Sequence, residues 1–126
     1  MDTKELSVKL KEKAINEGFA IAGIASVPGS SRIELRTKAL ERWLENNFHS
    51  DMKWMEADRR KNVDLILKGA KSVLSVGFNY LSEVDQSKQI FKIGKFSLGN
   101  DYHKIIHKKL KKIGIWLESQ IPECKW

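Results

Sequence analysis

Apolar residues recur at helical spacing in two early segments of the chain. In the first, Leu6, Leu10 and Ala14 lie about one turn apart, and Gly18 follows where a helix can end in a left-handed conformation. We therefore predict a helix over residues 3–17. A second helix is predicted further on, and its apolar face is formed by Leu40, Trp43, Leu44 and Phe48.

Short apolar runs bounded by turn-forming residues predict strands. Residues 19–25, with the sequence FAIAGIA, suit a buried strand because the run is too short for a typical helix. Residues 71–80 (KSVLSVGFNY) are rich in β-branched and aromatic side chains and give the clearest strand. We predict a helical turn near residues 65–67 and one further strand within residues 90–99 (IFKIGKFSLG).

The segment after residue 99 predicts a long amphipathic helix with a basic face. At 100° per residue, one narrow arc is apolar and the opposite side is basic. The apolar arc contains Ile106, Leu110, Ile113, Leu117 and Ile121. The basic side contains Lys104, Lys108, Lys111 and Lys112. Asn100 or Asp101 provides the N-cap, whose side-chain oxygen accepts a hydrogen bond from a free backbone N–H group.

The order helix, strand, helix, strand, strand, helix predicts a small layered α+β (α/β) fold. In this fold a small mixed sheet is flanked by helices, and the chain ends in the long basic helix. The sequence leaves open whether the strands near residues 21 and 75 run parallel, because this depends on the connection between them. A chain of 126 residues predicts a single domain over residues 1–126.

Composition and charge narrow the classes of protein. No apolar run approaches the ~20 residues that a membrane span needs, and residues 1–14 lack the apolar centre of a signal peptide. We therefore expect a cytoplasmic protein without a membrane partner. The single Cys124 excludes an internal disulfide. The net charge of +7 favours encounters with polyanions such as RNA or DNA.

Two histidines on the predicted basic helix raise the question of a metal site. His103 and His107 lie four residues apart and face the same way, as zinc ligands on a helix do. We predict no metal site, because no Glu stands between them and no cysteine cluster offers further ligands. His107 fits the edge of the core-facing arc, whereas His103 lies in the first turn beside Asp101 and Tyr102, where a ligand can be bound. The lysine side is either solvated or in contact with phosphates.

Four stretches of the chain together resemble one known family. They are GFAIAGIA from residue 18, FHSDMKWMEADRRKN from residue 48, LKGAKSVLSVGFNY from residue 67 and KFSLGNDYHKIIHKKLKKIGIWL from residue 95. In this order and approximate spacing they resemble the N-terminal region of epoxyqueuosine reductases. The most specific element is the step GNDYH at residues 99–103, and the next is GAKSV at residues 69–73. The resemblance covers essentially the whole chain.

The resemblance implies a cobalamin-dependent iron–sulfur enzyme that removes the epoxide oxygen of epoxyqueuosine in the anticodon loop of tRNA, the last step in making queuosine. In that family a cobalamin lies against the N-terminal region, electrons arrive through two 4Fe–4S clusters, and an aspartate donates a proton. In the family, the aspartate and the cluster cysteines would follow the position of Trp126. We therefore expect this chain to be an N-terminal part of such an enzyme and to be inactive by itself. The full-length protein is expected to be a monomer.

The resemblance implies a cofactor contact in the middle of the chain. Arg60 matches an arginine that precedes an Asp-Pro pair in the family, and it is a candidate for contacting the charged or amide periphery of cobalamin. Here the pair reads Asn62-Val63, which leaves open the local turn and therefore the direction of the Arg60 side chain. The neighbouring Met52, Trp54 and Met55 form either a lid on the core or a platform for the corrin ring.

Further cofactor candidates flank the last predicted strand and begin the last helix. Asp101, Tyr102 and His103 match the family motif beside the cofactor pocket. Asp101 is alternatively a plain helix cap, and Tyr102 either covers the corrin face or packs in the core. Asn79 and Tyr80 end the clearest strand, where sheet folds commonly place ligand contacts.

Three hypotheses remain open from the sequence. The first is the cofactor-side part of an epoxyqueuosine reductase, with the basic face of the last helix available to tRNA. The second is a stand-alone basic RNA-binding module without a cofactor. The third is a truncated, folded remnant without catalytic function.

Overall fold

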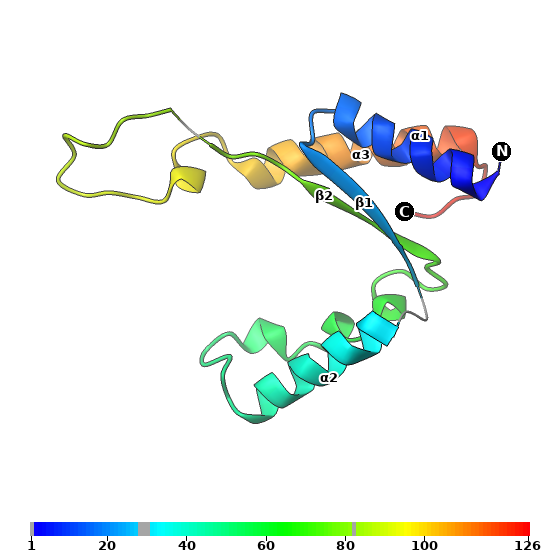
Figure 1. Cartoon of the computed structure of the whole chain (residues 1–126), viewed down its shortest axis with the longest axis horizontal. Coiled ribbons are helices and arrows are strands. Elements are labelled where there is room, and N and C mark those ends of the chain that lie inside the picture. Colours follow the sequence, from blue (N-terminus) through cyan, green and yellow to red (C-terminus); the bar gives the residue numbers. More distant parts are fainter. Residues whose placement is uncertain (1, 28–30, 82) are drawn as a thin grey trace. The chain divides into compact units, whose positions relative to one another are not determined.

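The computed structural model describes residues 2–27, 31–81 and 83–126 (Figure 1). Its helices and strands are α1 (Thr3–Asn16), β1 (Ile21–Ser26), α2 (Ser31–Glu45), β2 (Ser72–Gly77) and α3 (Tyr102–Gln120). Short 3-10 helices are η1 (Lys53–Met55), η2 (Asp58–Arg60), η3 (Val63–Leu65) and η4 (Lys95–Ser97). The three predicted helices and the first two predicted strands are therefore confirmed, with ends that differ by a few residues, and the α+β class is confirmed.

Contacts divide the chain into two compact units. The first unit contains Met1–Gly23 and Ser75–Trp126, and the second contains Ile24–Leu74. Both boundaries fall inside strands, so each unit contains part of β1 and part of β2. One domain over residues 1–126 stays a prediction.

The sheet has two antiparallel strands instead of the predicted mixed set. Ala20 N–H donates to the carbonyl of Gly77, and Val27 N–H donates to the carbonyl of Lys71, each at 2.8 Å. The connection between the strands contains α2 and the 3-10 helices η1 to η3, and it brings β2 back against β1 in the opposite direction. The direction that the sequence left open is thus decided by tertiary pairing.

The third predicted strand is wrong. Residues 90–99 contain the 3-10 helix η4 and otherwise irregular backbone. The side chain of Gln86 occupies both backbone groups of Ile93: it donates to the Ile93 carbonyl at 3.1 Å and accepts from the Ile93 N–H at 3.0 Å. Backbone groups that are bonded to a side chain are not available to a neighbouring strand.

The core of the first unit lies between α1 and α3, which pack against each other (Figure 1). Its buried apolar residues are Ala14, Phe19 and Ile113. The ring of Phe19 meets Phe78 edge-to-face at 6.2 Å between centroids. The predicted burial of residues 19–25 is confirmed for Phe19 and wrong for β1, where Ile21 is 67% exposed and no residue is buried. Within the described residues of this unit, α1 and α3 pack against each other, and a two-stranded sheet leaves much of its surface open.

Glu17, at the end of α1, links this helix to α3. Its carboxylate lies 2.7 Å from Lys13 Nζ and 3.4 Å from Lys112 Nζ, and its backbone carbonyl accepts a hydrogen bond from Lys109. The following Gly18 has φ of +90°, as predicted for the end of this helix. The hydrogen bond from Lys13 and the charge of Lys112 hold the pKa of Glu17 below its ordinary value, although burial acts in the opposite direction.

The stability of the first unit should therefore fall in acid through Glu17. Because the pKa of Glu17 is lower in the folded chain, its carboxylate stabilises the fold above the unfolded pKa of about 4.5, and this contribution is lost as the pH falls through the folded pKa. We expect the Tm of the wild type to exceed that of Glu17→Gln at pH 7, and the difference to shrink as the pH is lowered below about 4.5. A difference that stays constant with pH would contradict the ion-pair role.

Candidate functional site

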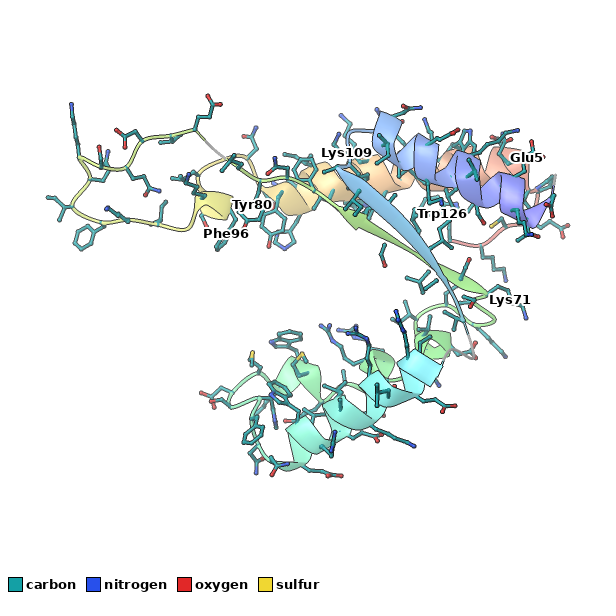
Figure 2. All side chains as sticks on the ribbon, viewed as in Figure 1. Glu5, Lys71, Tyr80, Phe96, Lys109 and Trp126 are labelled. Carbon is teal, nitrogen blue, oxygen red and sulfur yellow. The ribbon has the colours of Figure 1, made fainter. Side chains whose placement is uncertain are left out.

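An aromatic hollow opens at the start of α3, in the first unit. It has a volume of about 400 Å³ and is lined by Phe78, Tyr80, Phe96, Tyr102 and Ile106. Figure 2 shows Tyr80 and Phe96 next to each other, and their rings meet edge-to-face at 6.4 Å. The chain leaves β2 through Phe78 and Tyr80 and then returns through η4 to α3, which brings these side chains together. The hollow offers flat apolar surface to a ligand.

The first turn of α3 is organised by Asp101. Its Oδ1 accepts a hydrogen bond from the His103 N–H at 3.0 Å and lies 3.1 Å from His103 Nδ1. Asp101 is therefore the N-cap, one of the two residues predicted for this role. The rings of Tyr102 and His103 stack at 4.1 Å, and both residues line a second hollow of about 500 Å³ along α3.

The two candidates after β2 differ in their surroundings. Asn79 Oδ1 accepts a hydrogen bond from the Leu81 N–H at 2.9 Å, so this side chain shapes the turn that leaves the strand. Tyr80 is 60% exposed and lines the aromatic hollow with Tyr102. The structure thus brings together five of the six predicted cofactor residues in the first unit, and two of these, both tyrosines, share the aromatic hollow.

The sixth candidate, Arg60, belongs to the second unit. Its guanidinium lies over the indole ring of Trp54, 4.4 Å from the ring centroid. Trp54 is 53% exposed, so the pair lies at the surface. Asn62 accepts a hydrogen bond from the Asp64 N–H at 3.0 Å and caps η3. The cation–π contact favours this orientation of the Arg60 side chain and leaves guanidinium N–H groups available as donors.

His49 in the second unit was not singled out from the sequence. It is 7% exposed, its Nε2 lies 2.9 Å from Glu56 Oε1, and its ring lies 5.8 Å from the ring of Trp43. Its Nδ1 is buried without a hydrogen-bond partner in the part of the chain that is described. His49 anchors the segment after α2 to the helix, whereas Phe48, predicted for the apolar face, is 66% exposed. In the sequence, the one feature that pointed to His49 is its position directly after Phe48, the last residue of the predicted apolar face.

The lysines on α3 divide into two groups. Lys112 pairs with Glu17, and Lys109, which the sequence did not single out, binds the Glu17 carbonyl and lies 5.8 Å from the Phe78 ring. Lys104, Lys108 and Lys111 are exposed and make no ion pair with any described residue. We call these three residues the free lysine face.

The described residues contain neither a cluster of metal-ligand side chains nor a helix able to cross a membrane. No group of three or more His, Cys, Asp or Glu side chains is placed to hold a metal ion among residues 2–27, 31–81 and 83–126. In the same residues, no helix combines the length and the apolar character that crossing a membrane requires.

Comparison with known proteins gives one consistent result. A family model described as "Epoxyqueuosine reductase QueG, DUF1730" matches residues 60–126. Curated relatives named epoxyqueuosine reductase include one from Prochlorococcus marinus (strain NATL2A), 48% identical over 97% of this chain and 39% of the relative. Another, from Synechococcus sp. (strain CC9605), is 47% identical over 96% of this chain and 38% of the relative. A third, from Cellulophaga algicola (strain DSM 14237), is 37% identical over 98% of this chain and 40% of the relative.

The chain thus spans about two fifths of the length of these relatives: 39%, 38% and 40%. No solved structure matches the chain.

Proposed function

Because the chain belongs to the QueG family of epoxyqueuosine reductases, we propose that it forms the cofactor-side part of an enzyme that reduces epoxyqueuosine to queuosine in tRNA. The observation that supports this role is the shared aromatic hollow of Tyr80 and Tyr102, which lies beside the family motif at the start of α3. Converting the epoxide to an alkene releases its oxygen as water and consumes two electrons and two protons.

The residues of the first unit fit one face of a cobalamin. A corrin ring is flat with a largely apolar face, and the hollow presents the rings of Phe78, Tyr80, Phe96 and Tyr102. Asp101 and His103 place polar atoms in the turn next to it. When bound, cobalamin supplies a low-valent cobalt centre that delivers electrons. In this proposal Tyr80 and Tyr102 orient the cofactor and exclude water from its face.

Arg60 is proposed to bind the polar periphery of the cofactor. Its contact with Trp54 fixes the direction of a guanidinium that can donate to amide carbonyls or to a phosphate. Asn79, with its side-chain oxygen bonded to the Leu81 N–H, contributes by fixing the turn that carries Tyr80.

The residues of this chain do not fit an iron–sulfur cluster. A 4Fe–4S cluster is held by four thiolates, and Cys124 is the single cysteine of the sequence. We therefore propose that the clusters and the proton-donating aspartate belong to segments that the longer relatives possess, and we assign no catalytic residue here.

We propose tRNA as the macromolecular partner and the free lysine face as its contact surface. Lys104, Lys108 and Lys111 make no ion pair with a described carboxylate, and such lysines can bind phosphate groups. Lys112 can add to the positive potential, since its side chain is 57% exposed despite the pair with Glu17. A tRNA substrate places the protein in the cytoplasm.

Cofactor binding can be measured by titrating cob(II)alamin with the purified chain. We expect the corrin absorption bands to shift, and Arg60→Ala to raise Kd about tenfold, because a hydrogen bond to a charged group is worth about 1.5–3 kcal/mol. Arg59→Ala is the matched control, since Arg59 is the exposed neighbour of Arg60 in η2 and makes no cation–π contact with a ring among the described residues. Spectra that stay unchanged at high protein concentration would contradict the proposal.

A further inference from the structure

The loop between β2 and η4 carries an unusual apolar tip. Ile90 and Phe91 are 93% and 84% exposed, more than any other large hydrophobic residue described. No part of this unit buries them. Figure 1 shows the loop, coloured from green to yellow, reaching away from the pair of helices α1 and α3.

The loop is held in shape by its own side chains. Two hydrogen bonds join the Gln86 carboxamide to the backbone of Ile93, and the Gln89 N–H donates to the Gln86 carbonyl at 3.0 Å. We call the two hydrogen bonds between Gln86 and Ile93 the Gln86 clamp. Directly before it, Asp85 accepts hydrogen bonds from the backbone N–H and the hydroxyl of Ser87, each at 2.8 Å. The bond from the Ser87 N–H lowers the pKa of Asp85. These hydrogen bonds restrain the loop on both sides of the tip without support from a core, which reduces the entropy lost on binding.

From Gln86 to Asn100 the charged side chains all have one sign, whereas Asp85 directly precedes this segment. Lys88, Lys92 and Lys95 flank Ile90 and Phe91, and residues 86–100 contain no Asp or Glu. None of these three lysines forms an ion pair with a described residue. An aromatic ring between unpaired lysines is complementary to a partner that combines flat apolar groups with negative charges.

We propose that this loop, residues 86–95, binds RNA at unpaired bases. In this proposal the Phe91 ring stacks on an exposed base, Ile90 packs against the same base or its neighbour, and the lysines contact the adjacent phosphates. Unpaired bases are required, because paired bases in an RNA helix do not expose their faces. The inference rests on the proposed function in one respect: it takes tRNA, with its single-stranded loops, as the RNA.

The test is a titration of the chain with a labelled anticodon stem-loop RNA. We expect Phe91→Ala to raise Kd about tenfold, since loss of one stacked base reduces affinity by roughly that factor or more. The slope of log affinity against log salt should stay unchanged, because no charge is removed. Phe91→Trp should retain wild-type affinity. Phe48→Ala, which removes a 66% exposed ring elsewhere, is the matched control.

A second variant tests the clamp. Gln86→Ala removes both hydrogen bonds to Ile93 but leaves Phe91 and the lysines in place. We expect it to weaken RNA binding less than Phe91→Ala does. Equal affinities of Gln86→Ala and the wild type would overturn the part of the inference that assigns a role to the fixed tip.

The outcomes separate this inference from the proposed function. If the wild type does not bind the RNA, the proposed tRNA surface fails together with the loop. If the wild type binds and Phe91→Ala binds equally well, the loop inference alone is overturned. If Phe91→Ala instead loses binding to vesicles of anionic phospholipid while RNA binding is unchanged, the tip is a lipid-binding element and the inference is again overturned.

Discussion

Replacing Phe19 with alanine is expected to lower the free energy of unfolding by about 3–5 kcal/mol, the usual cost of removing a buried phenylalanine. Phe19 is 2% exposed and is one of three buried apolar residues among those that the structure describes. Its ring contacts Phe78 at 6.2 Å between centroids, and its N–H donates to the Ala14 carbonyl at 3.2 Å. Because few residues are buried, few apolar side chains lie close enough to move into the cavity that the truncation leaves.

A loss of this size is a large fraction of the total stability of a small domain, about 5–15 kcal/mol. Urea denaturation followed by circular dichroism measures it. Phe91→Ala is the matched control, because its ring is 84% exposed and its removal should change the free energy of unfolding by no more than about 0.5 kcal/mol. If the two variants lose equal stability, the core is not centred on Phe19.

Reversing two charges on the free lysine face is expected to abolish most binding of tRNA. Lys108→Glu with Lys111→Glu removes two phosphate contacts and adds repulsion on the exposed side of α3. The slope of log affinity against log salt should fall in magnitude by about 1.4–1.8, that is, 0.7–0.9 for each contact. At moderate salt we expect Kd to rise at least about tenfold. Filter retention of labelled tRNA over a series of salt concentrations measures both quantities.

The control for this experiment keeps the net charge equal. Lys4→Glu with Lys11→Glu reverses two exposed lysines on α1, in the same unit. If net charge alone drives binding, both double variants lose the same affinity, and the assignment of a surface on α3 fails. A surface on α3 predicts a small loss for the α1 pair. The cobalamin spectrum should be unaffected by either double variant, which separates the two binding activities.

The elements that the sequence predicted well depend on local interactions. The long helix α3 follows from the spacing of its apolar residues, and its start follows from the ability of the Asp101 carboxylate to accept a hydrogen bond from the His103 N–H. The end of α1 follows from Gly18, which adopts a left-handed conformation at low cost. The motif at residues 99–103 also identified the family. Each of these depends on residues a few positions apart.

The candidate site was predicted in part. The sequence placed Tyr80 and Tyr102 in separate motifs, one after a strand and one at the start of a helix. Only the path of the chain through η4 shows that they line one hollow with Phe96. Sequence spacing could not distinguish Lys112 from the other predicted lysines, because its pairing with Glu17 joins helices that lie far apart along the chain.

The sequence by itself determined where helices and the two paired strands lie, how α3 is amphipathic, and which family the chain resembles, because periodicity, capping and motifs are local properties. Tertiary structure alone decided the antiparallel pairing, the replacement of a third strand by the Gln86 clamp, and the burial of His49 against Trp43. These features depend on which distant groups satisfy each other's hydrogen bonds and apolar surface, and nearby residues do not specify those partners.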